Sequence, residues 1–160
     1  MSSATIRKAQ PSDVDEIHSL LMELSVYEKI EHLVESTPSS THRALFGESP
    51  SAEALVAEHE NSVVATAIYF QNYSTFMGRP GIYLEDIYVK PNYRGRGIGT
   101  NLLIELAGIA VARGCGRMDW TVLDWNASAI DFYRKLGATI LPDWRIVRLS
   151  GQEIQTLADQ

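Results

Sequence analysis

The chain has 160 residues and a formal net charge of −6 at pH 7, with 45% hydrophobic and 21% charged residues. This length and composition are typical of a single hydrophobic core, so we expect residues 1–160 to form one domain. The acidic balance argues against nucleic-acid binding, and no apolar run is long enough to span a membrane. Because the N-terminal residues lack a secretory signal, we expect a cytoplasmic protein.

Cysteine and histidine give no sign of a metal centre. The one cysteine, Cys115, excludes an internal disulfide and a cysteine-based zinc site. We interpret it as a small, partly buried thiol, because no histidine stands nearby in the sequence to activate it. The four histidines are scattered without the spacing of paired ligands, so we expect no metal.

The first part of the chain reads as a strand and two helices. Residues 5–10 predict a short strand, and residues 12–29 have apolar residues at helical spacing. Ser12 is the expected N-cap of this helix. Pro38 near a start and Gly47 at a stop predict a short second helix.

Strands dominate the middle of the sequence. Residues 52–59 and 62–71 predict a hairpin whose turn is Glu60-Asn61. Residues 72–81 read as a loop. The segment 82–90, "IYLEDIYVK", is rich in β-branched and aromatic residues and predicts a central strand.

Helices and strands alternate in the remainder. The expected elements are a helix, a strand, a helix closed by a glycine, a last strand and a helical tail, over residues 99–112, 117–125, 126–137, 144–149 and 151–158. The complete order predicts an α/β (α+β) sandwich of three layers.

The stretch "YRGRGIGTNLL", residues 93–103, joins the predicted central strand to a helix. Glycine reaches positive φ and lets another group approach the backbone, and the first N–H groups of a helix have no internal partner. With Arg94 and Arg96 beside them, these features predict a phosphate site. The alternative is a plain glycine-rich turn. A P-loop lysine is absent, and the spacing G-x-G-x-G differs from the dinucleotide fingerprint.

These residues resemble a known family. "YRGRGIG" matches the Arg-x-x-Gly-x-Gly/Ala acetyl-CoA motif of the GNAT superfamily of N-acetyltransferases. "ELSVYEK", "YLEDIYVKPNYRGRGIG", "VLDWNASAIDFYRKLGA" and "DWRI" resemble its diamine acetyltransferase branch, which includes spermidine/spermine and thialysine Nε-acetyltransferases. The resemblance covers nearly the whole chain. It implies a twisted mixed β-sheet with splayed central parallel strands, helices on both faces, and a homodimer.

The resemblance also implies how acetyl-CoA is held. The strand residues expected to pair with the pantetheine arm are Ile87, Tyr88 and Val89. The residues expected around the pyrophosphate are Arg94, Gly95, Arg96, Gly97, Ile98, Gly99 and Thr100. Asn126 and Ala129, on the following helix, are expected to contact the cofactor as well.

Acetylation of a primary amine needs a proton acceptor. The ammonium has a pKa near 10.4, so deprotonation at pH 7 costs about 4–5 kcal/mol. By resemblance Glu85 is the base, acting through water, and Tyr133 protonates the leaving thiolate. Alternation along a strand would place Glu85 and Asp86 on opposite faces, which leaves Asp86 a supporting role. Without the resemblance, the two acids read as a solvated strand bulge and Tyr133 as core.

Tyr27, Glu28, Trp125 and Trp144 match family positions at the amine, where aromatic rings and a carboxylate suit a cation. Their ordinary readings are a solvated helix end and core tryptophans. The chain is shorter than animal enzymes before "DWRI", and Asp143 is the nearest counterpart of an acid there. The expected reaction is direct acetyl transfer to thialysine, a lysine-like amino acid or a polyamine. A peptide or protein amine and a non-catalytic CoA-binding sensor are the alternatives.

Overall fold

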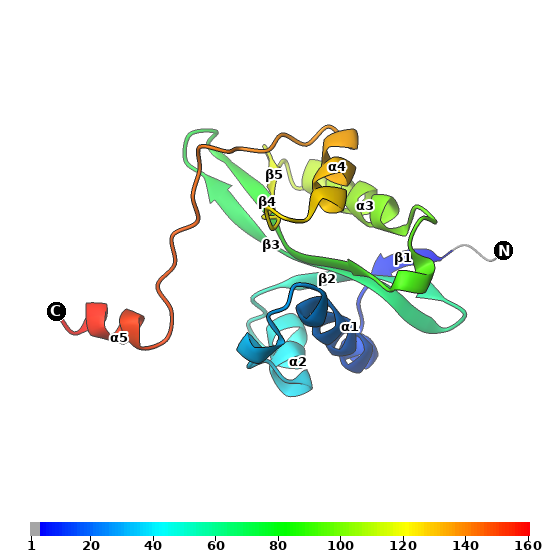
Figure 1. Ribbon diagram of the computed structural model, residues 1–160, viewed down its shortest axis with the longest axis horizontal. Coiled ribbons are helices and arrows are strands. Elements are labelled where there is room, and N and C mark those ends of the chain that lie inside the picture. The colour runs from blue at the N-terminus through cyan, green and yellow to red at the C-terminus, as the bar shows by residue number, and fades with distance from the viewer. Residues whose placement is uncertain (1–3) are drawn as a thin grey trace. The chain divides into compact units, whose positions relative to one another are not determined.

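The computed structural model describes residues 4–160, which form two compact units, residues 4–121 and 122–160. The first unit is built on one five-stranded sheet with the order β1-β2-β3-β4-β5 (Figure 1). The first four strands are antiparallel neighbours and the fifth is parallel to β4. Their bounds are β1 (Thr5–Lys8), β2 (Glu53–His59), β3 (Ser62–Ser74), β4 (Arg79–Val89) and β5 (Met118–Asp119).

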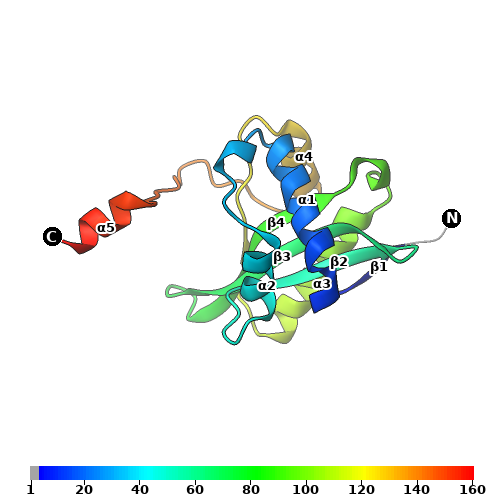
Figure 2. The same cartoon turned by 90° about the horizontal axis from the view of Figure 1, so that it is seen from below.

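Helices cover both faces of this sheet. α1 (Val14–Tyr27) and α2 (Pro38–Phe46) lie on one face, and α3 (Ile98–Ala112) lies on the other (Figure 1, Figure 2). Short 3-10 turns precede or connect these helices: η1 (Pro11–Asp13), η2 (Glu31–Leu33) and η3 (Pro91–Tyr93). The three layers confirm the α/β sandwich expected from the element order.

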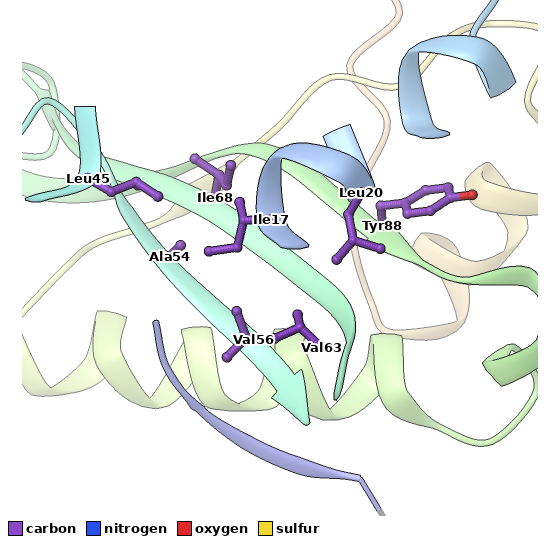
Figure 3. Packing of buried hydrophobic residues seen from close by; sticks show 8 residues of the cluster. All are labelled: Ile17, Leu20, Leu45, Ala54, Val56, Val63, Ile68 and Tyr88. Carbon is purple, nitrogen blue, oxygen red and sulfur yellow. The ribbon is translucent and has the colours of Figure 1, made fainter. Parts of the chain in front are cut away.

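Apolar side chains of α1 and α2 pack on the sheet (Figure 3). Ile17 and Leu20 are fully buried and belong to the face that the helical spacing predicts. They pack in one cluster with residues from α2 and three strands: Leu45, Ala54, Val56, Val63, Ile68 and Tyr88. The cluster fixes the face of β4 that α1 covers.

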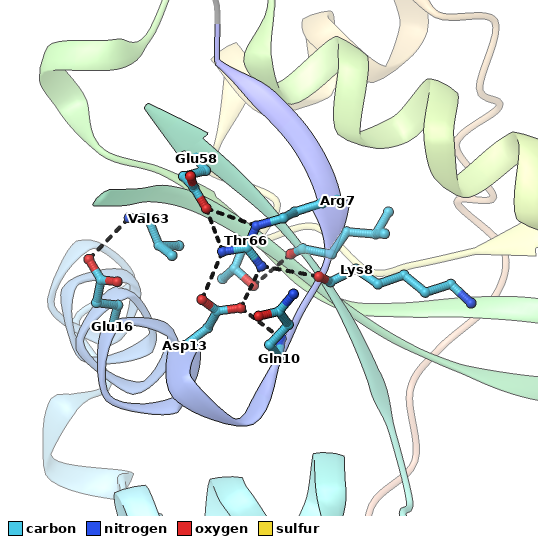
Figure 4. A network of polar contacts seen from close by, with 9 residues as sticks. Arg7, Lys8, Gln10, Asp13, Glu16, Glu58, Val63 and Thr66 are labelled. Atoms are coloured by element: carbon cyan, nitrogen blue, oxygen red, sulfur yellow. Dashed lines mark hydrogen bonds and ion pairs between the residues drawn. The ribbon is translucent and has the colours of Figure 1, made fainter. Parts of the chain in front are cut away.

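The expected cap at Ser12 is wrong, because a polar network determines the start of α1 (Figure 4). Asp13 stands at the N-cap position, and its carboxylate accepts from Arg7 Nη1 and from the backbone N–H of Gln10, both at 2.7 Å. Arg7 also donates to Glu58 at 2.6 Å. The sequence pattern lacked this signal, since Arg7 and Glu58 come from two different strands.

Of the two hairpins, one agrees with its predicted turn and the other has a shorter loop than predicted. The turn at Glu60 and Asn61 is confirmed, with φ of 51° and 61°. The loop expected over 72–81 is wrong in extent, because β3 continues to Ser74 and β4 begins at Arg79. The turn between them closes through the N–H of Gly78, which donates to the carbonyl of Ser74 at 2.9 Å.

The C-terminal part departs further from expectation. The strand expected over 117–125 is limited to Met118–Asp119. The second unit contains α4 (Ala127–Lys135) and α5 (Gln152–Ala158), both expected, but residues 144–149 form no strand and expose Val147 almost fully. β-Propensity reflects packing against neighbours, and this segment has no partner strand among the described residues. Between residues 4 and 160, no helix is long and apolar enough to cross a membrane.

Candidate active site

β4 contains a bulge at Glu85. The pairing joins Asp86 to Ile68 and Leu84 to Tyr69, and Ile68 and Tyr69 are adjacent in β3. Glu85 is therefore an extra residue in β4, and a bulge of this kind re-aims the side chains around it.

The bulge affects how the alternation rule applies to Glu85 and Asp86. Asp86 lies opposite Ile68, which belongs to the cluster beneath α1, so Asp86 faces α1. Leu84 lies opposite Tyr69 and faces the other way, towards α3. Alternation counted from Leu84 and alternation counted from Asp86 give Glu85 opposite faces, because the extra residue interrupts the pattern. The expectation that Glu85 and Asp86 occupy opposite faces therefore stays a prediction.

Asp86 is half-buried among other carboxylates. Burial, and after it the negative charges of Glu85 and Glu28, raise the pKa of Asp86 to about 6. Burial also raises the pKa of Glu28, which follows the last residue of α1. The structure thus brings Glu28, Glu85 and Asp86 together, and such a group favours a bound cation.

The edge of β4 that faces away from β3 is open beside these acids. Among the residues that the structure describes, β5 pairs with β4 only at Ile82 and Tyr83. The N–H of Lys90 donates to β3, so alternation directs the backbone groups of Val89 and Ile87 to the opposite edge. An extended ligand chain can add to such an edge. Tyr88 differs, since its backbone faces β3 and its side chain is in the core.

The glycine loop follows this edge directly. Gly95 and Gly97 have φ of 73° and 78°, and a Cβ built on either would meet no atom within 4 Å. Gly97 is the N-cap of α3, and the first turn from Ile98 carries no acid. The loop therefore has open space beside its backbone, and the N–H groups at the start of α3 and the helix dipole favour an anion there. These features fit the diphosphate of acetyl-CoA.

The two loop arginines lie differently. The guanidinium of Arg96 lies over the ring of Tyr93, its neighbour in the loop, at 5.1 Å. That of Arg94 lies over the rings of Tyr27 and Tyr88, at 5.4 and 5.3 Å, and its Nε donates to the carbonyl of Val89 at 2.9 Å. Sequence reasoning missed this arrangement, which joins the end of α1 to the end of β4.

The remaining expected site residues belong to the second unit. Asn126 caps α4, with its side-chain oxygen accepting from the N–H of Ala129 at 3.3 Å. Tyr133 is 7% exposed and its ring lies 5.3 Å from that of Phe132. Trp125 and Trp144 are exposed.

Comparisons with known proteins identify the family of the chain. Residues 14–138 match the family described as acetyltransferase (GNAT) family. The chain is 38% identical over 169 residues to thialysine N-epsilon-acetyltransferase of Mus musculus, covering 99% of both chains. It is 32% identical to spermidine/spermine N(1)-acetyltransferase-like protein 1 of Homo sapiens, covering 96% of this chain and 23% of that one.

A solved structure shares the fold throughout. An integron cassette protein from Vibrio cholerae superposes with a TM-score of 0.82 at 25% identity, covering 100% of both chains. The mixed five-stranded sheet with helices on both faces is a GNAT fold. The chain belongs to the acetyltransferase (GNAT) family, in its diamine acetyltransferase branch, and is an acetyl-CoA-dependent N-acetyltransferase.

Proposed function

We propose that the protein transfers the acetyl group of acetyl-CoA to a primary amine of a small cationic substrate, either a thialysine- or lysine-like amino acid or a polyamine. The observation that carries this proposal is the group of acids Glu28, Glu85 and Asp86 at the bulge of β4, beside its open edge. The relatives named for thialysine and spermidine/spermine support the same substrate class.

The cofactor is held by backbone groups in this proposal. Ile87 and Val89 offer N–H groups on the open edge for the pantetheine arm. The loop from Arg94 to Thr100 holds the diphosphate through N–H groups, and Arg96 adds charge. Asn126 and Ala129 contribute further contacts from the start of α4.

On the way from ammonium to amide the nitrogen loses two protons, and the leaving thiolate gains one. Glu85 accepts the ammonium proton, through a water molecule, so that the neutral amine nitrogen attacks the thioester carbonyl. Backbone N–H groups on the edge of β4 stabilise the oxyanion that develops. The C–S bond breaks, the hydroxyl of Tyr133 protonates the departing thiolate, and the second proton of the attacking nitrogen passes through water to restore the Tyr133 hydroxyl. Transfer is direct within a ternary complex.

The ammonium is bound by charge and by aromatic surface. Glu28 lies at the end of α1 beside Tyr27, which is 39% exposed. A carboxylate with an aromatic ring next to it suits a primary ammonium. In this proposal Trp125 and Trp144 contact the amine, as the family positions that they match do, and the protein is a homodimer, as the family implies. A cytoplasmic location is part of the same proposal. Sedimentation equilibrium checks the dimer.

An acetylation panel tests the proposal. Purified protein is given acetyl-CoA with thialysine, lysine, ornithine, putrescine, spermidine or a lysine peptide, and CoA release is followed. We expect turnover of at least one small amine in preference to the peptide. Release with the peptide alone would overturn the substrate class.

Variants test the roles. Glu85→Gln and Tyr133→Phe are each expected to lower kcat by about tenfold or more, as general acid–base groups do. The Kd for CoA, measured by calorimetry, should stay within about twofold in both, since neither side chain is placed at the diphosphate. Glu105→Gln on the exposed side of α3 and Tyr73→Phe near the hairpin tip are matched controls. Wild-type kcat in either site variant would refute its assignment.

A further inference from the structure

We propose that the Arg94 side chain is a positioning residue that couples the amine end of the site to the cofactor loop, and is not a phosphate ligand. This inference rests on the function proposed above. The family motif would send this guanidinium towards the diphosphate, whereas in the structure it reaches back to three residues of other elements.

The first contact is with the backbone of β4. Arg94 Nε donates to the carbonyl of Val89 at 2.9 Å. That carbonyl lies on the open edge, where a pantetheine arm would pair. With its oxygen bonded to Arg94, Val89 presents its N–H to a ligand, and the end of β4 is tied to the loop five residues later.

The second contact is aromatic. The guanidinium carbon lies 5.4 Å from the ring centre of Tyr27 and 5.3 Å from that of Tyr88, within the range of cation–π attraction. Tyr88 is anchored in the core, beside Glu23 of α1. Arg94 therefore holds Tyr27, the last residue of α1, against a fixed part of the sheet.

The consequence is a mechanical link between two binding regions. Tyr27 precedes Glu28, which belongs to the acidic group for the ammonium, and Arg94 opens the loop that meets the diphosphate. Loss of the guanidinium would release Tyr27 and Val89 together. An arginine is needed because only its planar group presents Nε to one carbonyl while its faces meet aromatic rings, and a lysine ammonium has no such plane.

Kinetics distinguish positioning from phosphate binding. For Arg94→Ala we expect the KM of the amine to rise about fivefold or more, with the Kd of CoA changed less than about threefold. Arg94→Lys should behave like Arg94→Ala, because it keeps the charge but loses the plane. Arg96→Ala should instead weaken mainly the binding of CoA. Arg43→Ala, at an exposed position of α2, should resemble wild type.

The salt dependence of CoA binding gives a second measure. A phosphate ligand adds an electrostatic contribution that salt screens, so its removal flattens the dependence of log Kd on log salt. We expect an unchanged slope in Arg94→Ala. If Arg94→Ala flattens the slope and Arg94→Lys restores it, Arg94 is a phosphate ligand and the proposal is wrong.

A double-mutant cycle tests the link without any turnover. Arg94→Ala and Tyr27→Leu are made singly and together, and the midpoint of urea unfolding is measured for the apo protein. We expect the combined shift to be clearly smaller than the sum of the single shifts, because both changes break the same contact. Additive shifts would overturn the link. Since the cycle needs no substrate, its result stays separate from any failure of the acetylation panel.

Discussion

The ionisation of Asp86 is a residue-scale property with a measurable consequence for stability. Burial and two neighbouring carboxylates raise its pKa from an ordinary 3.8 to about 6. The native protein thus binds this proton more tightly than the unfolded chain does. The stability it contributes is fully present below pH 3.8 and is lost as the pH rises through 6.

Asp86→Asn should therefore stabilise the protein at neutral pH. An amide cannot ionise, so at pH 7.5 we expect the free energy of unfolding to rise by about 1–3 kcal/mol, at about 1.4 kcal/mol for each pH unit between the two pKa values. At pH 4 the gain should nearly vanish. Urea unfolding at both values measures it, with Glu105→Gln as the exposed control. An equal gain at pH 4 and pH 7.5 would contradict the raised pKa.

A gain in stability from Asp86→Asn would indicate that the Asp86 carboxylate serves function and not folding. A carboxylate that destabilises the free enzyme is held beside Glu85 and Glu28, where a bound ammonium would offset their mutual repulsion. In the proposed function, the same variant that unfolds less readily should bind the amine less tightly.

Replacement by alanine should have opposite effects on stability at two glycines of α3, Gly97 at its N-cap and Gly108 in its interior. Gly97 has φ 78° and faces open space, whereas Gly108 lies on the exposed side of the helix interior. Gly97→Ala forces an L-residue into the left-handed region at a cost of about 1–2 kcal/mol. Gly108→Ala removes a helix-interior glycine and should add about 0.5–1 kcal/mol.

Binding should separate these variants further. We expect Gly97→Ala to raise the Kd of CoA by about fivefold or more, since the new methyl group occupies the space where the diphosphate approaches the backbone. Gly108→Ala should leave that Kd unchanged. Thermal unfolding and calorimetric titration of both proteins check the pair. Equal Kd values for the two variants would place the anion elsewhere.

Most elements could be predicted because the residues that start or end each one lie within or beside it in the sequence. Pro38 and Gly47 bound α2, and the turn at Glu60 and Asn61 sets the β2–β3 hairpin. Gly137, with φ 90°, follows α4 as expected. In each case the backbone conformation of one or two residues determines where the element ends.

Non-local pairing explains what the sequence left open. The bulge at Glu85 arises from the register between β3 and β4, which no pattern within β4 reports. Residues 144–149 have a strand composition but no strand, since a strand forms only with a partner. The motif predicts Arg94 at the phosphate. Its contacts with Tyr27 and Tyr88 depend on the packing of α1 against β4, which the motif does not report.

At the scale of the whole molecule, charge is divided between two regions of the first unit. The chain carries a net charge of −6, yet every charged residue between Val89 and Leu103 is basic. The acids Glu28, Glu85 and Asp86 lie close together, at the end of α1 and at the bulge of β4. An anionic cofactor and a cationic amine are thus each met by charge of the opposite sign, and net charge alone does not describe either site.

Salt should therefore lower kcat/KM for the amine, because it screens the attraction between the ammonium and the nearby acids. With acetyl-CoA saturating, we expect kcat/KM for the best amine to fall about fivefold between 20 and 300 mM NaCl, as the Debye length shortens from about 20 to about 6 Å. Glu28→Gln should flatten this dependence. Glu105→Gln changes the net charge by the same amount on the opposite face of the sheet, so it should keep the wild-type slope. Equal flattening by both variants would mean that the overall charge, and not the acids near Glu85, attracts the amine.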